Sequence, residues 1–295
     1  MATPREIRRR IISVKNTQKI TKAMQMVASV KLKRARDKTI AARPYSEKLK
    51  QIVESIVSFV PPKSSTFIKA KNDIKNVCIL VVGSDKGLCG SFNANVVKRT
   101  IRVLLENKDK NCKLIVIGKK PFETLKRKQV NISYSFTDIM ISPKYSNAAL
   151  IGNKILKEYA DGTIDKVIAI YNYFKSPASS EVISETILPL EIEKKDVSKA
   201  LYIFEPEPEE TFDSLFTHYF IGQIWKIFLE SHSAQLAASM TTMYAATKNA
   251  GKLIDSLTLY YNKVRQGIIT KELLEIVSGA EALRWNKFLN KTAYY

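Results

Sequence analysis

The chain has 295 residues, enough for one large domain or two small ones. No apolar stretch reaches the roughly 18–20 residues that a membrane span needs, and the N-terminus lacks the apolar core of an export signal. The three cysteines form no CxxC pair, and with only two histidines the sequence offers no metal-ligand cluster. Three scattered thiols fit a reducing cytosol.

Positive charge is the strongest compositional feature, and it is concentrated at one end. The formal net charge is +20, and residues 1–50 carry 15 Lys/Arg against 3 Asp/Glu. Residues 209–295 are nearly balanced, with 9 Lys/Arg against 8 Asp/Glu. The N-terminal segment is therefore expected to meet an acidic partner, and nucleic acid, anionic lipid and an acidic protein surface all remain open.

Residues 4–58 are predicted to form one long helix. Thr3-Pro4 fits a helix start, and Pro61-Pro62 ends the pattern. Pro44 should kink or divide the helix. The apolar stripe begins at Ile7, Ile11 and Val14, then meets the polar or small residues Gln18, Thr21, Gln25 and Ala28. A second stripe starts at Ile20, Met24 and Val27, so we expect a ragged seam that drifts around the helix.

Residues 76–206 change to alternating strands and helices. The predicted strands are 77–82, 114–117, 167–171, 182–188 and 201–204, and the predicted helices are 93–106, 121–127 and 146–159. This order predicts a helix-covered sheet with parallel strands.

A second long helix is predicted from Glu209, because no proline follows. Its stripe steps by four and three, as in a coiled coil: Leu236, Met240, Met243, Thr247, Ala250, Ile254, Leu257, Tyr261, Val264 and Ile268. One helix over 209–283 would be about 110 Å long, whereas a domain of this size is roughly 30 Å across. Two projecting helices paired antiparallel are therefore favoured over the alternative, a bundle packed on the domain.

The loop Gly83-Ser-Asp-Lys-Gly-Leu-Cys-Gly90 lies between a strand and a helix, where phosphate-binding loops occur. It lacks both the GK[ST] ending of a P-loop and the GxG of a dinucleotide fingerprint. We therefore interpret it as a close-packed structural turn, with a phosphate site as the alternative. Cys89 is interpreted as a buried small residue rather than a nucleophile.

Other chemistry finds little support in the sequence. His218 and His232 are too far apart for one metal ion, and the acidic residues form no defensible catalytic pair. The basic N-terminal helix could bind nucleic acid, but residues 1–44 contain no aromatic side chain for base stacking. A solvated charged face is the plain alternative. The candidate phosphate contacts would be Arg8, Arg9, Arg10, Lys15, Lys19, Lys22, Lys31, Lys33, Arg34 and Arg36.

Several motifs, in order along nearly the whole chain, resemble the γ subunits of F-type ATP synthases of the bacterial type. They are Asn16-Thr-Gln-Lys-Ile-Thr-Lys-Ala-Met-Gln-Met-Val-Ala28, Ala42-Arg43-Pro44-Tyr45, Ser84-Asp-Lys-Gly-Leu-Cys-Gly-Ser-Phe-Asn93, Glu205-Pro-Glu-Pro208, Ala246-Thr-Lys-Asn-Ala250, Tyr261-Asn-Lys-Val-Arg-Gln266 and Ile269-Thr-Lys-Glu-Leu-Leu-Glu-Ile-Val-Ser-Gly-Ala280.

This resemblance implies a non-catalytic central-stalk rotor without cofactor or metal. Residues 1–60 and 207–295 would be the helices of an antiparallel coiled coil, and 75–206 a Rossmann-like α/β domain. The partners would be the α and β subunits of the catalytic ring, the ε subunit and the c-ring, with no nucleic acid. The chain would be peripheral, on the cytoplasmic face of the bacterial cell membrane. It would couple c-ring rotation to the conformational cycle of β.

The resemblance also assigns contact residues. Those that would touch β are Arg8, Arg9, Lys22, Met24, Arg265, Gln266, Thr270 and Glu272, and those that would face the c-ring and ε are Phe204, Glu205 and Glu207. Two positions depart from the family, which usually has an acidic residue at Gln235 and a basic one at Ser239. The regulatory dithiol insertion of chloroplast relatives is absent, and residues 284–295 extend past the family's usual end.

Overall fold

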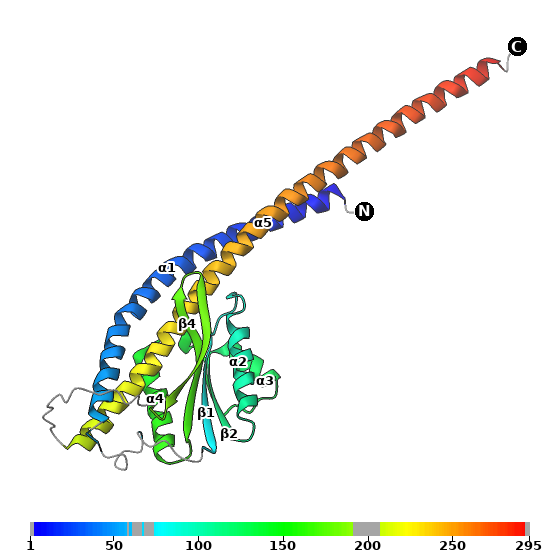
Figure 1. The fold of residues 1–295 in the computed structure, drawn as a ribbon. Coiled ribbons are helices and arrows are strands. Elements are labelled where there is room, and N and C mark those ends of the chain that lie inside the picture. The colour runs from blue at the N-terminus through cyan, green and yellow to red at the C-terminus, as the bar shows by residue number, and fades with distance from the viewer. Residues whose placement is uncertain (1–2, 58, 61–66, 68–73, 191–206, 293–295) are drawn as a thin grey trace. The chain divides into compact units, whose positions relative to one another are not determined.

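A computed structural model describes residues 3–57, 59–60, 67, 74–190 and 207–292, with the side chains of 209 and 282–292 left out. The elements in chain order are α1 (Pro4–Val57), β1 (Asn76–Val82), α2 (Phe92–Glu106), β2 (Asn111–Ile117), α3 (Lys119–Arg127), β3 (Tyr134–Phe136), the 3₁₀ helix η1 (Ile139–Ile141), α4 (Tyr145–Ala160), β4 (Lys166–Ser176), β5 (Ser179–Leu188) and α5 (Pro208–Thr292). Figure 1 labels most of these elements.

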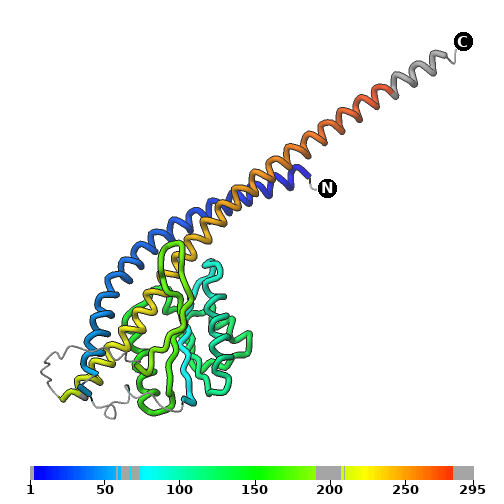
Figure 2. The backbone as a smooth tube through the Cα atoms, in the orientation of Figure 1, coloured from blue at the N-terminus to red at the C-terminus, as the bar shows by residue number. Residues whose placement is uncertain are grey.

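The chain divides into two compact units. One, the helix-pair unit, comprises Met1–Met24 and Met243–Tyr295, and the other, the α/β unit, comprises Gln25–Thr242. Both long helices contribute to both units, and Figure 2 traces their backbones. The three-part division drawn from the sequence, at 60, 75 and 207, stays a prediction.

Within the helix-pair unit, α1 and α5 run antiparallel. The Thr21 hydroxyl lies 2.8 Å from that of Thr247, and a Cβ added at Gly251 would lie 3.2 Å from the Gln18 amide nitrogen. Higher numbers on one helix thus meet lower numbers on the other. The predicted stripe of α5 is its less exposed face: Met243 and Ala250 are buried, and Thr247, Ile254, Leu257, Tyr261 and Val264 are half-buried.

The seam of α1 differs from the ragged one predicted. Ile7 is buried, Ile11 and Val14 are half-buried, and the covered face continues through Gln18, Thr21, Gln25 and Ala28. The apolar alternatives Ile20, Met24 and Val27 are 60%, 38% and 55% exposed. The prediction of a drifting seam was therefore wrong. Polar residues hold the seam because they find partners across it, as the paired threonine hydroxyls do.

The α/β unit contains a five-stranded sheet of order β3-β2-β1-β4-β5. The first four strands are parallel, but β5 pairs antiparallel with β4. The two strands are joined by a short turn at Pro177 and Ala178, too short for the crossover that parallel pairing needs. The sheet is therefore mixed, and the expectation of parallel strands holds for β1 to β4 only.

Each face of this sheet is covered by a separate apolar cluster. On one face, Val77, Ile79 and Val81 of β1 pack with residues of α2 such as Val96 and Val103. On the other, alternate β1 residues join α4 and the parts of α1 and α5 in this unit, with Phe212, Phe216, Phe220 and Phe228 from α5. The two-residue alternation of β1 thus holds α1 and α5 against the sheet.

The element boundaries lie within a few residues of those predicted. Pro44 lies inside α1 without dividing it, and α5 continues past Gly279. The short elements β3 and η1 were not predicted. The predicted strand at 201–204 lies outside the described residues. No helix among those described is long and apolar enough to cross a membrane.

Candidate coupling surfaces

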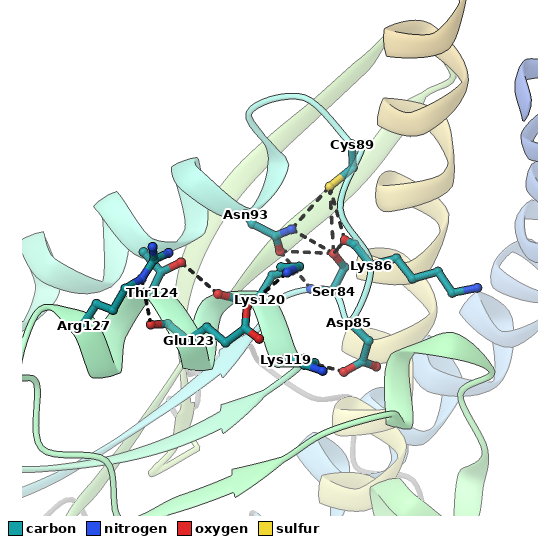
Figure 3. Close-up of polar contacts among 10 residues, drawn as sticks. All are labelled: Ser84, Asp85, Lys86, Cys89, Asn93, Lys119, Lys120, Glu123, Thr124 and Arg127. Atoms are coloured by element: carbon teal, nitrogen blue, oxygen red, sulfur yellow. Dashed lines mark hydrogen bonds and ion pairs between the residues drawn. The ribbon is translucent and has the colours of Figure 1, made fainter. Parts of the chain in front are cut away.

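The Gly83–Gly90 loop is held in shape by hydrogen bonds within the loop and to Asn93 of α2 (Figure 3). The Asn93 side chain of α2 accepts a hydrogen bond from the Ser84 backbone N–H at 3.0 Å, and its amide nitrogen donates to the Ser84 hydroxyl at 2.9 Å. The Ser84 hydroxyl also donates to the Lys86 carbonyl at 2.6 Å. A Cβ at Gly83 would meet Pro121 at 2.7 Å. These contacts favour the structural interpretation of the loop.

Asp85 is the residue of this loop whose role the sequence did not suggest. Its carboxylate accepts backbone hydrogen bonds from Lys119 and Asp138 at one oxygen and from Met140 at the other, each 2.8 Å long. Although only 8% of it is exposed, the charge is satisfied by these three donors. Asp85 thereby fixes the start of α3 and the η1 segment to the end of β1.

Cys89 is also explained by packing. The side chain is 3% exposed, and burial raises the pKa of its thiol, partly offset by hydrogen bonding to Ser84 and Asn93. A raised pKa disfavours the nucleophilic thiolate. Cys89 thus behaves as the predicted buried small residue. Among the described residues, no group of three or more His, Cys, Asp or Glu could hold a metal ion.

The residues predicted to contact β all lie on exposed surface. Arg8, Arg9, Lys22 and Met24 are exposed on α1. On α5, Arg265, Gln266, Thr270 and Glu272 are exposed too, within two turns of one another. The described contacts do not bring the two groups together. Of the predicted c-ring contacts, Glu207 is exposed, whereas Phe204 and Glu205 lie outside the described residues.

No described helix of the helix-pair unit pairs with one section of α5, residues 265–281. The register set by Thr21 and Thr247 brings the start of α1, at Pro4, opposite the turn that contains Val264 and Arg265. Beyond that turn every described side chain through Glu281 is exposed. The section includes large apolar residues between 38% and 68% exposed: Ile268, Ile269, Leu273, Leu274, Ile276 and Val277. Exposed apolar residues gathered in this way mark an interaction site.

A basic pocket of about 230 Å³ lies in the α/β unit between α1, α5 and the segments around Lys86 and Met140. Its cationic lining residues are Lys31, Arg34, Lys38 and Lys86. The described lining contains no Asp or Glu, and none of these four cations forms an ion pair with a described residue. Lys38 and Lys86 were not singled out from the sequence, although Lys86 belongs to the loop motif. The pocket's unbalanced charge suits an acidic partner.

His232 of α5 forms one wall of this pocket, and its Nδ1 lies 3.0 Å from the Met140 carbonyl oxygen. Burial lowers its pKa, the bond to Met140 partly opposes that shift, and the nearby Lys31 and Lys38 lower the pKa further. The imidazole is therefore neutral at neutral pH, donating from Nδ1. His218 lies elsewhere on α5 and is exposed.

At the two positions that depart from the family pattern, a neutral contact is present. The Gln235 amide donates to the Ser239 hydroxyl at 3.3 Å, one turn along α5. No salt bridge is possible at these positions, since neither side chain is ionisable. A bond of this length between neutral groups contributes little to stability.

A mixed α/β sheet and two long helices that run antiparallel define the fold class of this chain. The model of the family described as ATP synthase matches residues 3–283. The ATP synthase γ chain of Chloroherpeton thalassium is 40% identical over 300 residues, covering 96% of this chain and 99% of that one. The γ chain of Halothermothrix orenii is 39% identical, covering 96% and 100%.

Solved structures agree. A chain in the structure titled Tetrahymena thermophila mitochondrial ATP synthase, central stalk/c-ring, is 27% identical with a TM-score of 0.62, covering 77% of this chain and 99% of that one. A chain from the Euglena gracilis mitochondrial ATP synthase has a TM-score of 0.68 at 18% identity, covering 96% and 95%, and so shows the fold alone. The chain therefore belongs to the ATP synthase γ chains. It is a non-catalytic subunit, the central-stalk rotor of an F-type ATP synthase.

Proposed function

We propose that this rotor acts on the β subunits through two surfaces and on the membrane sector through a third. The first surface is the unpaired section of α5, residues 265–281. The second is the basic side of α1 with the basic pocket. The third is the segment that ends at Glu207, which faces the c-ring and ε. The chain is then peripheral, on the cytoplasmic face of the bacterial membrane.

The observation that carries the proposal is the exposure of the unpaired section. Its apolar side chains are suited to contact with a surrounding ring of α and β subunits. Arg265, Gln266, Thr270 and Glu272 add polar groups to the same stretch. Among the described residues, the one side-chain hydrogen bond that these four form runs from the Thr270 hydroxyl to the Gln266 carbonyl. Their remaining hydrogen-bonding capacity is free for a partner.

The charge of α1 and of the basic pocket supports the second surface. Lys31, Arg34, Lys38 and Lys86 are exposed and unopposed by acids in the pocket. Attraction between such cations and acidic loops of β changes gradually with distance and angle, unlike close packing, which resists deformation. A contact between rotating parts needs an attraction that changes gradually with angle. The exposed Ile20, Met24 and Val27 provide apolar contacts along the same helix.

The first surface is tested by the double variant Arg265→Ala, Gln266→Ala. We expect rotation-coupled ATP synthesis in the assembled complex to fall by about fivefold or more, since truncating central interface residues costs about 1 kcal/mol or more. The subunit should still fold, because both side chains are exposed. Synthesis is measured in vesicles carrying an imposed ion gradient.

The matched control is Lys248→Ala, Asn249→Ala, which truncates a similar exposed pair on the paired part of α5. It should leave synthesis near the wild-type rate. Near-normal ATP synthesis by the assembled Arg265→Ala, Gln266→Ala variant would contradict the proposed role of these two residues in contacting β.

The third surface is tested by reversing charge at Glu205 and Glu207. We expect ion-coupled activity to fall more than ATP hydrolysis by the detached catalytic part, because that part lacks the c-ring. An equal loss in both assays would place these residues away from the membrane sector.

A further inference from the structure

Four consecutive residues of α5, Glu230–Ser233, each contact a different element of the α/β unit. The Glu230 carboxylate accepts from the Phe174 N–H of β4 at 3.2 Å, the Ser231 hydroxyl lies 3.5 Å from the Val82 carbonyl of β1, His232 bonds the Met140 carbonyl of η1 at 3.0 Å, and the Ser233 hydroxyl lies 3.0 Å from that of Thr39 on α1.

Helix geometry makes this run unusual. Successive side chains of an α-helix point about 100° apart, so four in a row surround most of its circumference. Glu230, Ser231 and Ser233 are fully buried, at 0% exposure, and His232 is half-buried. Thus α5 makes polar contacts in four directions around its axis within about one turn. We call Glu230–Ser233, with Thr39 and Arg43 of α1, the polar collar.

Arg43 connects the three main elements of the collar. Its Nε donates to the Glu230 carboxylate at 2.9 Å, and a terminal nitrogen donates to the Phe174 carbonyl at 3.2 Å. Its guanidinium carbon also lies 5.5 Å from the centre of the Tyr173 ring. Arg43 of α1 therefore binds Glu230 of α5 and the Phe174 carbonyl of β4, and Glu230 in turn binds the Phe174 N–H.

Burial of these groups needs a reason beyond stability. A buried ion pair is often no more stabilising than apolar residues of similar volume. Apolar packing surrounds the collar already, with four phenylalanines of α5 in the adjoining cluster. Apolar attraction is non-directional, whereas hydrogen bonds require particular distances and angles. Polar contacts on several sides therefore resist rotation of α5 about its own axis more specifically than apolar contacts do.

We propose that the polar collar is the torque joint of this rotor, the cross-section at which rotation passes between the α/β domain and the two helices. Arg43 and Glu230 are its positioning residues. This inference rests on the chain's role as a rotor and adds a mechanical role to Arg43 and Glu230, which belong to none of the three contact surfaces proposed above. Softening the collar should let the domain twist against the helices without separating from them.

The test compares two double variants with a control in the other apolar cluster. Arg43→Met with Glu230→Leu replaces the ion pair by apolar side chains, and Thr39→Val with Ser233→Ala removes both members of a hydroxyl pair. Replacing both partners avoids leaving a buried group unsatisfied at that pair. The control, Val116→Ala, makes a cavity at a fully buried residue on the face packed by α2 and α3.

The readout is torsional stiffness in a complex of this chain with its α and β subunits. A bead attached to the α/β domain of the rotor is followed while ATP drives the surface-fixed catalytic ring, and the spread of bead angles during pauses is measured. We expect a wider spread for both collar variants than for wild type at comparable melting temperature, and a wild-type spread for Val116→Ala.

The conservative variant Glu230→Gln keeps an acceptor for Phe174 but loses the charge, so its spread should be intermediate. This variant also serves if the apolar pair fails to assemble. The proposed torque joint would be contradicted if the collar variants showed the wild-type spread of bead angles, or if the Val116→Ala control showed an equally wide spread. A wild-type complex whose bead never rotates would instead contradict the rotor role itself.

Discussion

At the scale of single residues, Asp85 shows how a charge becomes structural. An aspartate in a glycine-containing loop after a strand has the position of a ligand-binding group, and no sequence pattern distinguishes that from a buried brace. The structure does so through three backbone donors at 2.8 Å. Those donors come from segments at 119 and 138–140, so no local pattern around residue 85 contains the information.

Replacing this carboxylate by an amide should destabilise the α/β unit. In Asp85→Asn, the remaining oxygen can accept from Lys119 and Asp138, but the amide nitrogen then faces the Met140 N–H, leaving a buried donor unsatisfied. The expected loss is about 1–3 kcal/mol in the free energy of unfolding. Urea unfolding of the full chain measures it, with Asp109→Asn, the same change at an exposed site, as control. Equal free energies of unfolding for the two variants would contradict the structural role given to Asp85.

His232 predicts a pH dependence of stability. Its folded-state pKa lies below the ordinary value of 6.5, so between those two values the unfolded chain binds more protons than the folded one. The free energy of unfolding should therefore fall as the pH drops through about 6.5 and level off below the folded-state pKa.

The variant His232→Gln, which can still donate to Met140, should lose this contribution and show a flatter dependence. Urea unfolding at about pH 7.5 and about pH 5.5 gives the difference. His218→Gln, at an exposed position of the same helix, is the control and should keep the wild-type slope. A wild-type slope in His232→Gln would show that another group titrates.

At the scale of elements, the two long helices differ in how far the sequence reveals them. The stripe of α5 was predicted correctly from Leu236 to Val264, because its apolar residues keep one period for several turns, whereas Ile268 at its end is exposed. The seam of α1 was not, because its covered residues include Gln18, Thr21 and Gln25 while Ile20, Met24 and Val27 are exposed. Hydropathy identifies the covered face of a helix only when the apolar residues lie on that face, and in α1 several of them do not.

Glycine substitutions in α5 test how the helix pair is packed. Alanine at Gly267, where an added Cβ meets nothing within 4 Å, should stabilise the helix by up to about 1 kcal/mol. At Gly251 the gain should be smaller, because the Gln18 amide, 3.2 Å from the added Cβ, must move. Melting temperatures of the full chain and both variants are compared. A larger gain at Gly251 than at Gly267 would contradict the pairing described.

At the scale of the whole molecule, the plan of two terminal helices and a central α/β domain followed from the change of pattern at residues 76 and 209. The mixed direction of the sheet could not be predicted, because the direction of β5 depends on a two-residue turn rather than on the strand's own composition. The short elements β3 and η1 were missed for a similar reason: they are held by Asp85 and by pairing with β2, not by local propensity.

The C-terminal tail is helical to Thr292, as predicted for the stretch through Leu289. Trp285, Phe288 and Leu289 are spaced to share one helical face, which would need cover in the complex. Removing residues 284–295 should therefore lower the thermal stability of the assembled complex but preserve coupling, since the load-bearing contacts are proposed at 265–272. Coupling is measured as ATP synthesised per ion translocated. An uncoupled truncated complex would place the load in the tail instead.

The rotor role is tested most directly by watching this chain turn. A cysteine introduced at the exposed Asp109, in a Cys112→Ser background, gives a bead attachment point on the α/β domain, because Cys78 and Cys89 are buried and burial raises their thiol pKa values. With the α and β subunits fixed to a surface and ATP supplied, the bead should rotate continuously in one direction and stop when ATP is removed. A bead that only fluctuates about one angle while ATP is hydrolysed would contradict the account.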